Sequence, residues 1–141
     1  MTDEAPTHPT PAPSALTQPW WDAAKERRLT VQHCIACDRL IFYPREFCPS
    51  CLSSELEWRE MSGKGHVHTY TVIRQAAHPY FQEHVPYLYG VVKLVEGPQM
   101  FTNFLMDLDA IEIGQPVEAV FTDISDEYAI VQWKPSPRAT P

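Results

Sequence analysis

Cys34-Ile-Ala-Cys37 and Cys48-Pro-Ser-Cys51 are the stretches that decide the fold of this 141-residue chain. Ten residues separate the two C-x-x-C pairs. A C-x-x-C pair on a tight turn directs both sulfurs inward, and two such turns can place four thiolates around one tetrahedral Zn²⁺. Because protein sulfur would then fill every coordination position, the metal would organise the fold and perform no chemistry. The four cysteines therefore predict a closed structural zinc site.

Two other uses of the cysteines are open. Two disulfides would also pair them. The acidic, proline-rich stretch at residues 1–19 is not of the secretory-leader type, so we expect no oxidising compartment, and repeated C-x-x-C spacing favours a metal. Iron accepts the same four thiolates. Rubredoxin-type loops usually place glycine after the second cysteine, whereas Asp38 follows Cys37 and Leu52 follows Cys51. We therefore expect zinc.

The composition predicts a small folded protein in the cytoplasm. Hydrophobic residues make up 44% of the chain and aromatic residues 11%, which is enough for a real core. At this length the chain can hold a small metal-stabilised module and a compact domain of about a hundred residues or fewer. No run of about eighteen apolar residues is present, so no contact with a membrane is expected.

Charge is distributed unevenly along the chain. The net charge is −7, with +2 in residues 25–74 and −6 from residue 75 onward. Proteins that bind nucleic acids depend on Lys and Arg to neutralise phosphates. The acidic second half therefore argues against a nucleic-acid partner.

Both ends of the chain are predicted to be flexible, over residues 1–19 and 136–141. The first of these segments holds five of the fourteen prolines and has little to bury. The sequence from Trp20 to about Arg28 favours a short helix, with basic residues in its last turn. Trp20 and Trp21 could cover the core of the domain itself or anchor a partner protein, and both alternatives remain open.

Alternating hydrophobic patterns predict two β units. Ser62-Gly63-Lys64-Gly65 breaks the pattern and marks a boundary between residues 20–61 and 62–135. In the second unit, Val67, Thr69, Thr71 and Ile73 are expected to share one face of a long strand. The predicted strands are 29–33, 40–43 and 56–61 in the first unit, and 66–75, 87–94, 99–105, 116–122 and 128–134 in the second. Five strands with a long interruption over 76–86 favour an OB-type barrel.

The order of these motifs resembles a known family. The segments that carry the resemblance, after the aromatic N-terminal helix, are Cys34-x2-Cys37, Phe42-Tyr43-Pro44-Arg45, Phe47-Cys48-Pro49-Ser50-Cys51, Ser62-Gly63-Lys64-Gly65-His66-Val67 and Ile113-Gly114-Gln115-Pro116-Val117. Over residues 20–135 the chain resembles rubredoxin-like zinc ribbons joined to acyl-CoA-associated OB-fold domains. The resemblance implies a mainly β protein with a short N-terminal helix, a zinc ribbon and a five-stranded barrel.

The same resemblance implies a function. Such proteins are non-catalytic companions of thiolase-superfamily enzymes, including thiolases, aldolases and hydroxymethylglutaryl-CoA synthase, and some associate with hot-dog-fold enoyl-CoA hydratases. We expect this chain to form a hetero-oligomer with a thiolase-like subunit, to scaffold it and to help position an acyl-CoA thioester in a degradation pathway. The partner would supply the catalytic residues.

Aromatic and basic side chains are the candidate contacts with an acyl-CoA or a partner. The candidates are Trp20, Trp21, Arg39, Arg45, His78, Tyr80, Phe81 and Tyr87. The two arginines could contact CoA phosphates or lie in surface ion pairs. The aromatic residues of the loop could line an acyl passage, dock on a partner or plug one end of the barrel.

Two other functional hypotheses remain. A zinc ribbon with an OB fold could hold single-stranded nucleic acid, and an autonomous hydrolase could use His78 or His84. The chain has no G-x-S-x-G elbow, and zinc would occupy all four cysteines. His66 and His68 lack a third ligand in sequence and are expected at the surface or in the core. His33 is expected to contact the ribbon and not to replace a cysteine ligand.

Overall fold

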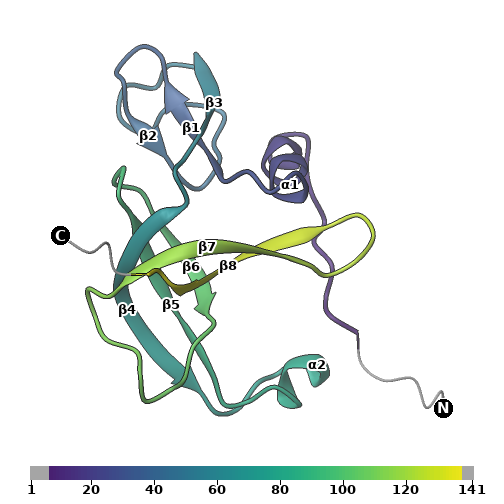
Figure 1. The fold of residues 1–141 in the computed structure, drawn as a ribbon. Coiled ribbons are helices and arrows are strands. Elements are labelled where there is room, and N and C mark those ends of the chain that lie inside the picture. Colours follow the sequence, from purple (N-terminus) through teal and green to yellow (C-terminus); the bar gives the residue numbers. More distant parts are fainter. Residues whose placement is uncertain (1–6, 138–141) are drawn as a thin grey trace.

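The computed structural model describes residues 7–137, and these form two β units and two short helices (Figure 1). The elements are α1 (Gln18–Lys25), β1 (Thr30–Cys34), β2 (Leu40–Ile41), β3 (Leu56–Glu60), β4 (Lys64–Ile73), α2 (Pro79–Gln82), β5 (Tyr87–Leu94), β6 (Gln99–Phe104), β7 (Pro116–Asp123) and β8 (Ala129–Pro135). Within the described range, neither helix has the length and hydropathy needed to cross a membrane. The mainly β fold predicted from the sequence is confirmed.

The first unit is a three-stranded antiparallel sheet with the order β2-β1-β3. In the central strand, His33 is paired with Leu40 on one side and with Glu57 on the other. All five residues of β1 are buried, because the strand has neighbours at both edges and the barrel beneath it. This sheet lies at one end of the barrel in Figure 1 and carries the cysteine turns.

The second unit is a closed barrel with the strand order β4-β5-β6-β8-β7. Antiparallel pairing of Gly65 with Val117 joins β4 to β7, and a single parallel pair, Phe104 with Trp133, joins β6 to β8. This is the five-stranded OB arrangement that the sequence predicts. The interruption between the first two barrel strands contains the four-residue helix α2, which the sequence analysis does not predict.

The predicted alternation along β4 is wrong beyond Val67. A β-bulge shifts the register between Val67 and Thr69, so one extra residue sits in this strand. An extra residue exchanges the two faces of the strand from that point on. Tyr70 and Val72 therefore pack against the core. The sequence pattern instead places Thr71 and Ile73 on the same face as Val67.

The larger of two hydrophobic core clusters in the described residues, called here the common core, runs through both units. Its buried members are Leu29, Val31, Met61, Val67, Leu88, Val92, Leu94, Met100, Phe104, Ile111, Val117 and Trp133. Leu29, Val31 and Met61 belong to the segments around the first sheet, and the others belong to the barrel. The predicted boundary near residues 61–62 stays a proposal. The strands before it pair within the first sheet and those after it pair within the barrel, but this core contains residues from both sides of it.

Helix α1 ends earlier than the sequence predicts. It begins at Gln18, within the segment predicted to be flexible, and ends at Lys25 and not near Arg28. Arg28 N–H donates to Ala23 O at 2.9 Å and Arg27 N–H donates to Ala24 O at 3.0 Å, the bonds of a Schellman motif. Arg27 accordingly adopts a φ of 66°, which stops the helix. Residues 1–6 of the predicted flexible segment lie outside the described residues.

An ion-pair cluster ties the end of α1 to the barrel. Asp123 accepts two hydrogen bonds from the guanidinium of Arg27, at 3.0 and 2.8 Å, and one from Lys25 Nζ at 3.1 Å. The hydrogen bonds from Arg27, and then the one from Lys25, lower the pKa of Asp123 to about 2. Since these side chains are solvent-exposed, we expect a modest contribution to stability.

Asp123→Asn is expected to lower the melting temperature slightly at neutral pH. The folded-state pKa lies below the ordinary aspartate value of about 3.9, so the stabilisation is present above that value and is lost as the pH falls toward 2. The difference between the two proteins should therefore shrink between about pH 4 and pH 2. Thermal unfolding followed by circular dichroism at a series of pH values measures it, with Asp126→Asn in the same turn as the control. An unchanged gap at low pH would contradict this assignment.

Candidate metal centre and adjoining surfaces

Two matching turns hold the four cysteines. In the first turn Asp38 N–H donates to Cys34 O at 2.8 Å, and in the second Leu52 N–H donates to Cys48 O at 2.9 Å. A second hydrogen bond closes each turn in the same way, and its donor is the N–H of the first cysteine of the pair. Cys34 N–H donates to Arg39 O, and Cys48 N–H donates to Ser53 O. The repeat in sequence is thus a repeat in structure.

The residues after each cysteine pair adopt the conformation that usually selects glycine. Asp38 and Leu52 both have a φ of 64°. Most side chains avoid this left-handed region. The turns therefore have the shape for which rubredoxin-type loops use glycine, although the sequence lacks it. The residues that follow the two cysteine pairs therefore do not distinguish zinc from iron.

The four sulfurs fit one tetrahedral ion. Cys34 Sγ lies 3.5 Å from Cys51 Sγ, Cys37 Sγ lies 3.6 Å from Cys48 Sγ, and all four atoms are within 4.8 Å of one another. A tetrahedron with Zn–S bonds of about 2.3 Å has edges of about 3.8 Å. Disulfides would need separations of about 2.05 Å, and all four cysteines are free. The donor set is that of a structural zinc site, as predicted.

The backbone prepares one of the four thiols for metal binding. Hydrogen bonding from the backbone N–H of Cys51, and then of Ser50, lowers the pKa of Cys48 to about 6. Desolvation, and then hydrogen bonds with Cys48 and Cys34, raise the pKa of Cys37 to about 12. Neighbouring thiolates repel one another, so full deprotonation needs a central cation. When bound, zinc would link the two turns and hold all four sulfurs as thiolates.

His33 supports the ribbon and lies outside the metal cluster, as expected. Its buried ring bridges two carboxylates: Nδ1 lies 2.8 Å from Glu57 Oε1, and Nε2 contacts Asp38 Oδ1. These contacts lower the pKa of both carboxyl groups, with the hydrogen bond to His33 as the main cause. In residues 7–137, the four cysteines form the only group with metal-ligand geometry, and His66 and His68 lie on β4 away from it.

A continuous line of aromatic rings crosses the molecule and is named here the aromatic strip. Its members are, in spatial order, Tyr89, Phe101, Tyr43, Phe42, Trp20, Trp21 and Tyr128. Neighbouring ring centroids are 4.4 to 6.5 Å apart. Tyr89 and Phe101 are parallel within 1°. The strip joins the outer face of the barrel, the loop after β2 and helix α1.

A shallow apolar groove follows the middle of the strip. Its volume is about 230 Å³, and it is lined by Thr17, Trp20, Trp21, Phe42, Tyr43, Pro44, Met100, Phe101 and Val131. Tyr43 is 49% exposed and Phe101 is 59% exposed. Trp20 and Trp21 are half-buried and pack both on the domain and beside this groove. The two alternatives for the tryptophans, core cover and partner anchor, are therefore compatible.

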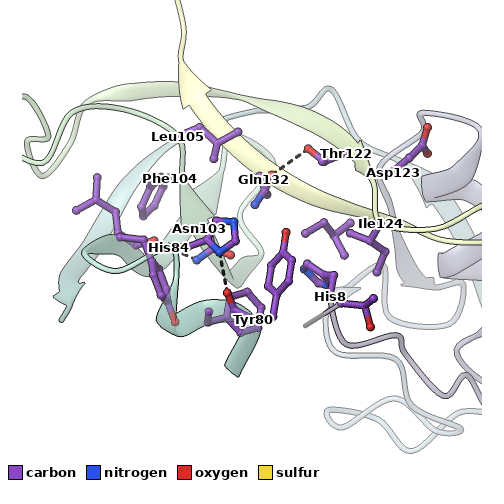
Figure 2. Close-up of a pocket in the computed structure, with 15 residues that line it drawn as sticks. His8, Tyr80, His84, Asn103, Phe104, Leu105, Thr122, Asp123, Ile124 and Gln132 are labelled. Atoms are coloured by element: carbon purple, nitrogen blue, oxygen red, sulfur yellow. Dashed lines mark hydrogen bonds between the residues drawn. The ribbon is translucent and has the colours of Figure 1, made fainter. Parts of the chain in front are cut away.

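A larger pocket lies between helix α2 and the turn that joins β7 to β8, and is named here the barrel pocket (Figure 2). Its volume is about 640 Å³. It is lined by Thr7, His8, Tyr80, Phe81, His84, Tyr87, Leu88, Asn103, Phe104, Leu105, Thr122, Asp123, Ile124, Ile130 and Gln132. Tyr80, Phe81 and Tyr87 were candidates from the sequence, whereas Asn103 and Gln132 were not. Both are neighbours along the strand of the buried core residues Phe104 and Trp133, so neither points into the core. That they meet at this pocket depends on strand register, which the sequence does not specify.

The remaining candidates line neither depression, although the ring centroid of His78 lies 5.9 Å from that of Phe81. His78 caps helix α2, since its Nδ1 accepts a hydrogen bond from Tyr80 N–H at 3.1 Å. Arg39 donates to the hydroxyl of Ser50 within the ribbon. Arg45 is exposed, and its backbone N–H donates to Gln32 Oε1 at 2.7 Å. A role of the arginines in binding CoA phosphates stays a prediction.

The fold and the cysteine site define a class of protein: a four-thiolate zinc ribbon fused to an OB-fold barrel. Two family models match the chain, the rubredoxin-like zinc ribbon domain of ChsH2 over residues 21–57 and the C-terminal OB-fold domain of ChsH2 over residues 58–122. The chain belongs to this family of ChsH2-like, DUF35-domain proteins. The family resemblance predicted from the sequence is confirmed.

Several relatives are similar over most of the chain. A DUF35 domain-containing scaffold protein of Methanothermobacter thermautotrophicus is 34% identical, over 77% of this chain and 82% of the relative. A scaffold protein of the same description from Methanocaldococcus jannaschii is 35% identical, over 76% and 77%. A probable enoyl-CoA hydratase alpha subunit of Thermomonospora curvata is 36% identical over 91% of this chain, which spans 40% of that relative's length.

Solved structures show the same architecture. A chain of the Ltp2-ChsH2(DUF35) aldolase superposes with a TM-score of 0.82 and 35% identity, over 89% of this chain and 98% of the other. A DUF35-family protein of unknown function from Sulfolobus solfataricus superposes with a TM-score of 0.62 at 14% identity, over 87% of both chains. This second likeness concerns the fold alone.

Proposed function

We propose that this chain is a non-catalytic accessory subunit that scaffolds a thiolase-like or aldolase-type enzyme acting on an acyl-CoA. The observation that carries the proposal is the aromatic strip. Interfaces depend on a few central aromatic anchors surrounded by contacts that exclude water. Exposed Tyr43 and Phe101 beside an apolar groove have the composition of such a centre.

The rigidity of the strip suits a scaffold. Phe42 and Tyr43 come from the loop after β2, Phe101 from β6 and Trp20 from α1. The zinc site holds the first of these segments, Met100 and Phe104 hold β6 in the hydrophobic core, and α1 packs against β1, β7 and β8. A surface built in this way loses little conformational entropy on binding. The scaffold descriptions of the archaeal relatives and the two-component description of the superposed aldolase support this role.

The chemistry is assigned to the partner. Zinc would engage all four cysteines of this chain as structural thiolates, which leaves none as a nucleophile. His78 is occupied as a helix cap, and His84 Nδ1 contacts Tyr80 O at 2.7 Å. We propose a cytoplasmic hetero-oligomer in a degradation pathway, in which the partner cleaves or forms the carbon–carbon bond of an acyl-CoA.

Tyr43→Ser combined with Phe101→Ser is expected to weaken binding to the partner by about tenfold or more, as loss of a central hot spot does. The test is co-expression with thiolase-like chains of the same organism, affinity capture of this chain and size-exclusion chromatography. The unaltered chain should elute as a stable hetero-oligomer. Ile113→Ser is the matched control, because Ile113 is 68% exposed but distant from the strip.

Two results would contradict this proposal. One is a monomeric chain that alters neither the solubility nor the rate of any thiolase-like chain tested. The other is equal loss of binding in the Ile113→Ser control. Zinc content and melting temperature, measured on each variant, separate loss of the interface from loss of the fold.

The similarity to the hydratase alpha subunit favours a second candidate function, an accessory role beside an enoyl-CoA hydratase of the hot-dog fold. The same capture experiment, repeated with hydratase-like chains, separates the two. Retention of a hydratase subunit with no retention of a thiolase-like chain would select the second candidate.

A further inference from the structure

The barrel pocket lies where an OB barrel offers a ligand site. Ligands of this fold usually meet the face of its second and third strands and the loops that follow the first and fourth strands. Here those strands are β5 and β6, and the loops contain α2 and the turn between β7 and β8. The pocket is lined by residues of all four, such as Tyr80, Leu88, Asn103 and Ile124 (Figure 2).

The walls of the pocket are mainly apolar. Its aromatic and aliphatic lining residues are Tyr80, Phe81, Tyr87, Leu88, Phe104, Leu105, Ile124 and Ile130. The ring of His8 closes one side, with its centroid 5.0 Å from that of Tyr80 and 5.3 Å from that of Phe81. A volume of about 640 Å³ lies within the range of about 300–1,000 Å³ that small-molecule sites occupy.

Two amide side chains supply polar groups at fixed positions. Gln132 Oε1 accepts a hydrogen bond from the hydroxyl of Thr122 at 2.9 Å, which leaves the Nε2 hydrogens as donors. Asn103 Nδ2 donates to Leu88 O at 3.1 Å, which leaves Oδ1 as an acceptor. Since one end of each amide is anchored, the other end is oriented before any ligand arrives. Such groups suit a neutral carbonyl or hydroxyl group.

The charges around the pocket disfavour phosphate. No lysine or arginine is among its lining residues in the described chain. Its one carboxylate, Asp123, is engaged by Arg27 and Lys25, so these two cations are already paired. An anionic group placed here would lose hydration without gaining a permanent cation, because the other basic groups of the lining are the imidazoles of His8 and His84. The nucleotide part of a CoA ester is therefore disfavoured in this pocket.

We infer that the barrel pocket binds an uncharged, largely apolar group through its aromatic walls and the Asn103 and Gln132 amides. If the proposed function holds, on which this last step rests, that group is the acyl body of the thioester, and the phosphates stay outside. The pocket itself requires no partner. It shares no lining residue with the groove beside the aromatic strip, although Asn103 is paired with Tyr89 of the strip across β6 and β5, so partner and acyl group would occupy adjoining sites on the barrel.

Binding of 2-naphthol and 2-naphthyl phosphate to the zinc-loaded full-length chain tests this inference. The two probes share an aromatic body and differ in charge. Isothermal titration calorimetry should show saturable binding of 2-naphthol and at least tenfold weaker binding of the phosphate. Gln132→Leu should weaken 2-naphthol binding severalfold, because it removes the oriented donor.

A matched pair of substitutions locates the site. Ile124→Glu places a carboxylate at the pocket and should weaken 2-naphthol binding at least tenfold, whereas Ile113→Glu, on a distant exposed loop, should leave it unchanged. Absence of saturable binding, equal affinity for the two probes, or equal effects of the two glutamates would overturn the inference. The assay uses this chain alone, so its failure is distinct from a failure to capture a partner.

Discussion

Replacing Cys48 with serine is expected to abolish stoichiometric zinc binding and to unfold the ribbon. Cys48 is fully buried, accepts a hydrogen bond from Ser50 N–H at 3.4 Å, and carries the thiol whose pKa is lowered to about 6. A serine hydroxyl stays protonated at neutral pH and does not replace the thiolate. Structural zinc sites contribute about 10–16 kcal/mol of binding energy in small peptides, and that energy is folding energy. Loss of one ligand removes much of it.

The effect should extend beyond the ribbon. Apart from the cysteines, the small core around the metal contains Ile41 and part of Leu56, which is too little to fold without the ion. Strand β1 carries Cys34 at its end and Val31 in the common core, and Val31 is fully buried against the barrel. We therefore expect a lower melting temperature for the whole chain as well as loss of the metal.

Metal analysis by mass spectrometry and thermal unfolding measure these two effects. Ser50→Ala is the matched control, since it removes the hydroxyl that Arg39 contacts but keeps all four thiolates. A chelator added to the unaltered protein should reproduce the Cys48→Ser phenotype. Retention of zinc and of the original melting curve by the Cys48→Ser protein would show that the cysteines do not form the metal site.

The strands were predictable because their local patterns agree with their tertiary setting. The sequence alone allows assignment of three short strands around the two cysteine turns and of five alternating segments after them. A barrel then follows from the presence of five strands in the second unit. The bulge at His68 was not predictable, because nothing in the local pattern signals an extra residue. The end of α1 was missed for a related reason: Arg27 adopts the left-handed conformation without being glycine.

The site was predictable in part. The cysteine ligands follow from spacing, since each C-x-x-C pair is local. The aromatic strip does not, because Tyr43, Phe101 and Trp20 meet only after the barrel closes under the ribbon. The register between β5 and β6 would have indicated one contact of the strip, that between Tyr89 and Phe101. Val91 faces Phe101 across β5 and β6, which brings Tyr89 and Phe101 to diagonal positions on the outer face.

Gly90→Ala is expected to destabilise the barrel by more than about 4 kcal/mol, an exceptionally large effect for one methyl group. Gly90 lies buried in the middle of β5, paired with Tyr70 on one side and Thr102 on the other. A Cβ atom at this position would lie 2.2 Å from Thr69 O and 2.7 Å from Tyr70 Cα. Both are backbone atoms, so no side-chain rotation relieves the overlap.

The overlap should separate β4 from β5 where the barrel bends. The bulge between Val67 and Thr69 brings the backbone of β4 close to β5, and Gly90 is the residue without a Cβ that accepts this approach. With a domain stability of about 5–15 kcal/mol, a loss of this size leaves much of the protein unfolded or aggregated. Urea denaturation followed by tryptophan fluorescence measures it, with a signal from Trp133, which is buried in the barrel, and from Trp20, Trp21 and Trp58.

The other glycines provide an internal scale for this prediction. Gly65→Ala should also be harmful, since its Cβ would lie 2.6 Å from Lys93 O. Gly114→Asn should be mild, because no atom lies within 4 Å of a Cβ there and asparagine tolerates the φ of 88°. The expected order of destabilisation is Gly90, then Gly65, then Gly114. If Gly90→Ala were as stable as Gly114→Asn, the close approach of β4 and β5 would be wrong, and with it the curvature that closes the barrel beneath the zinc ribbon.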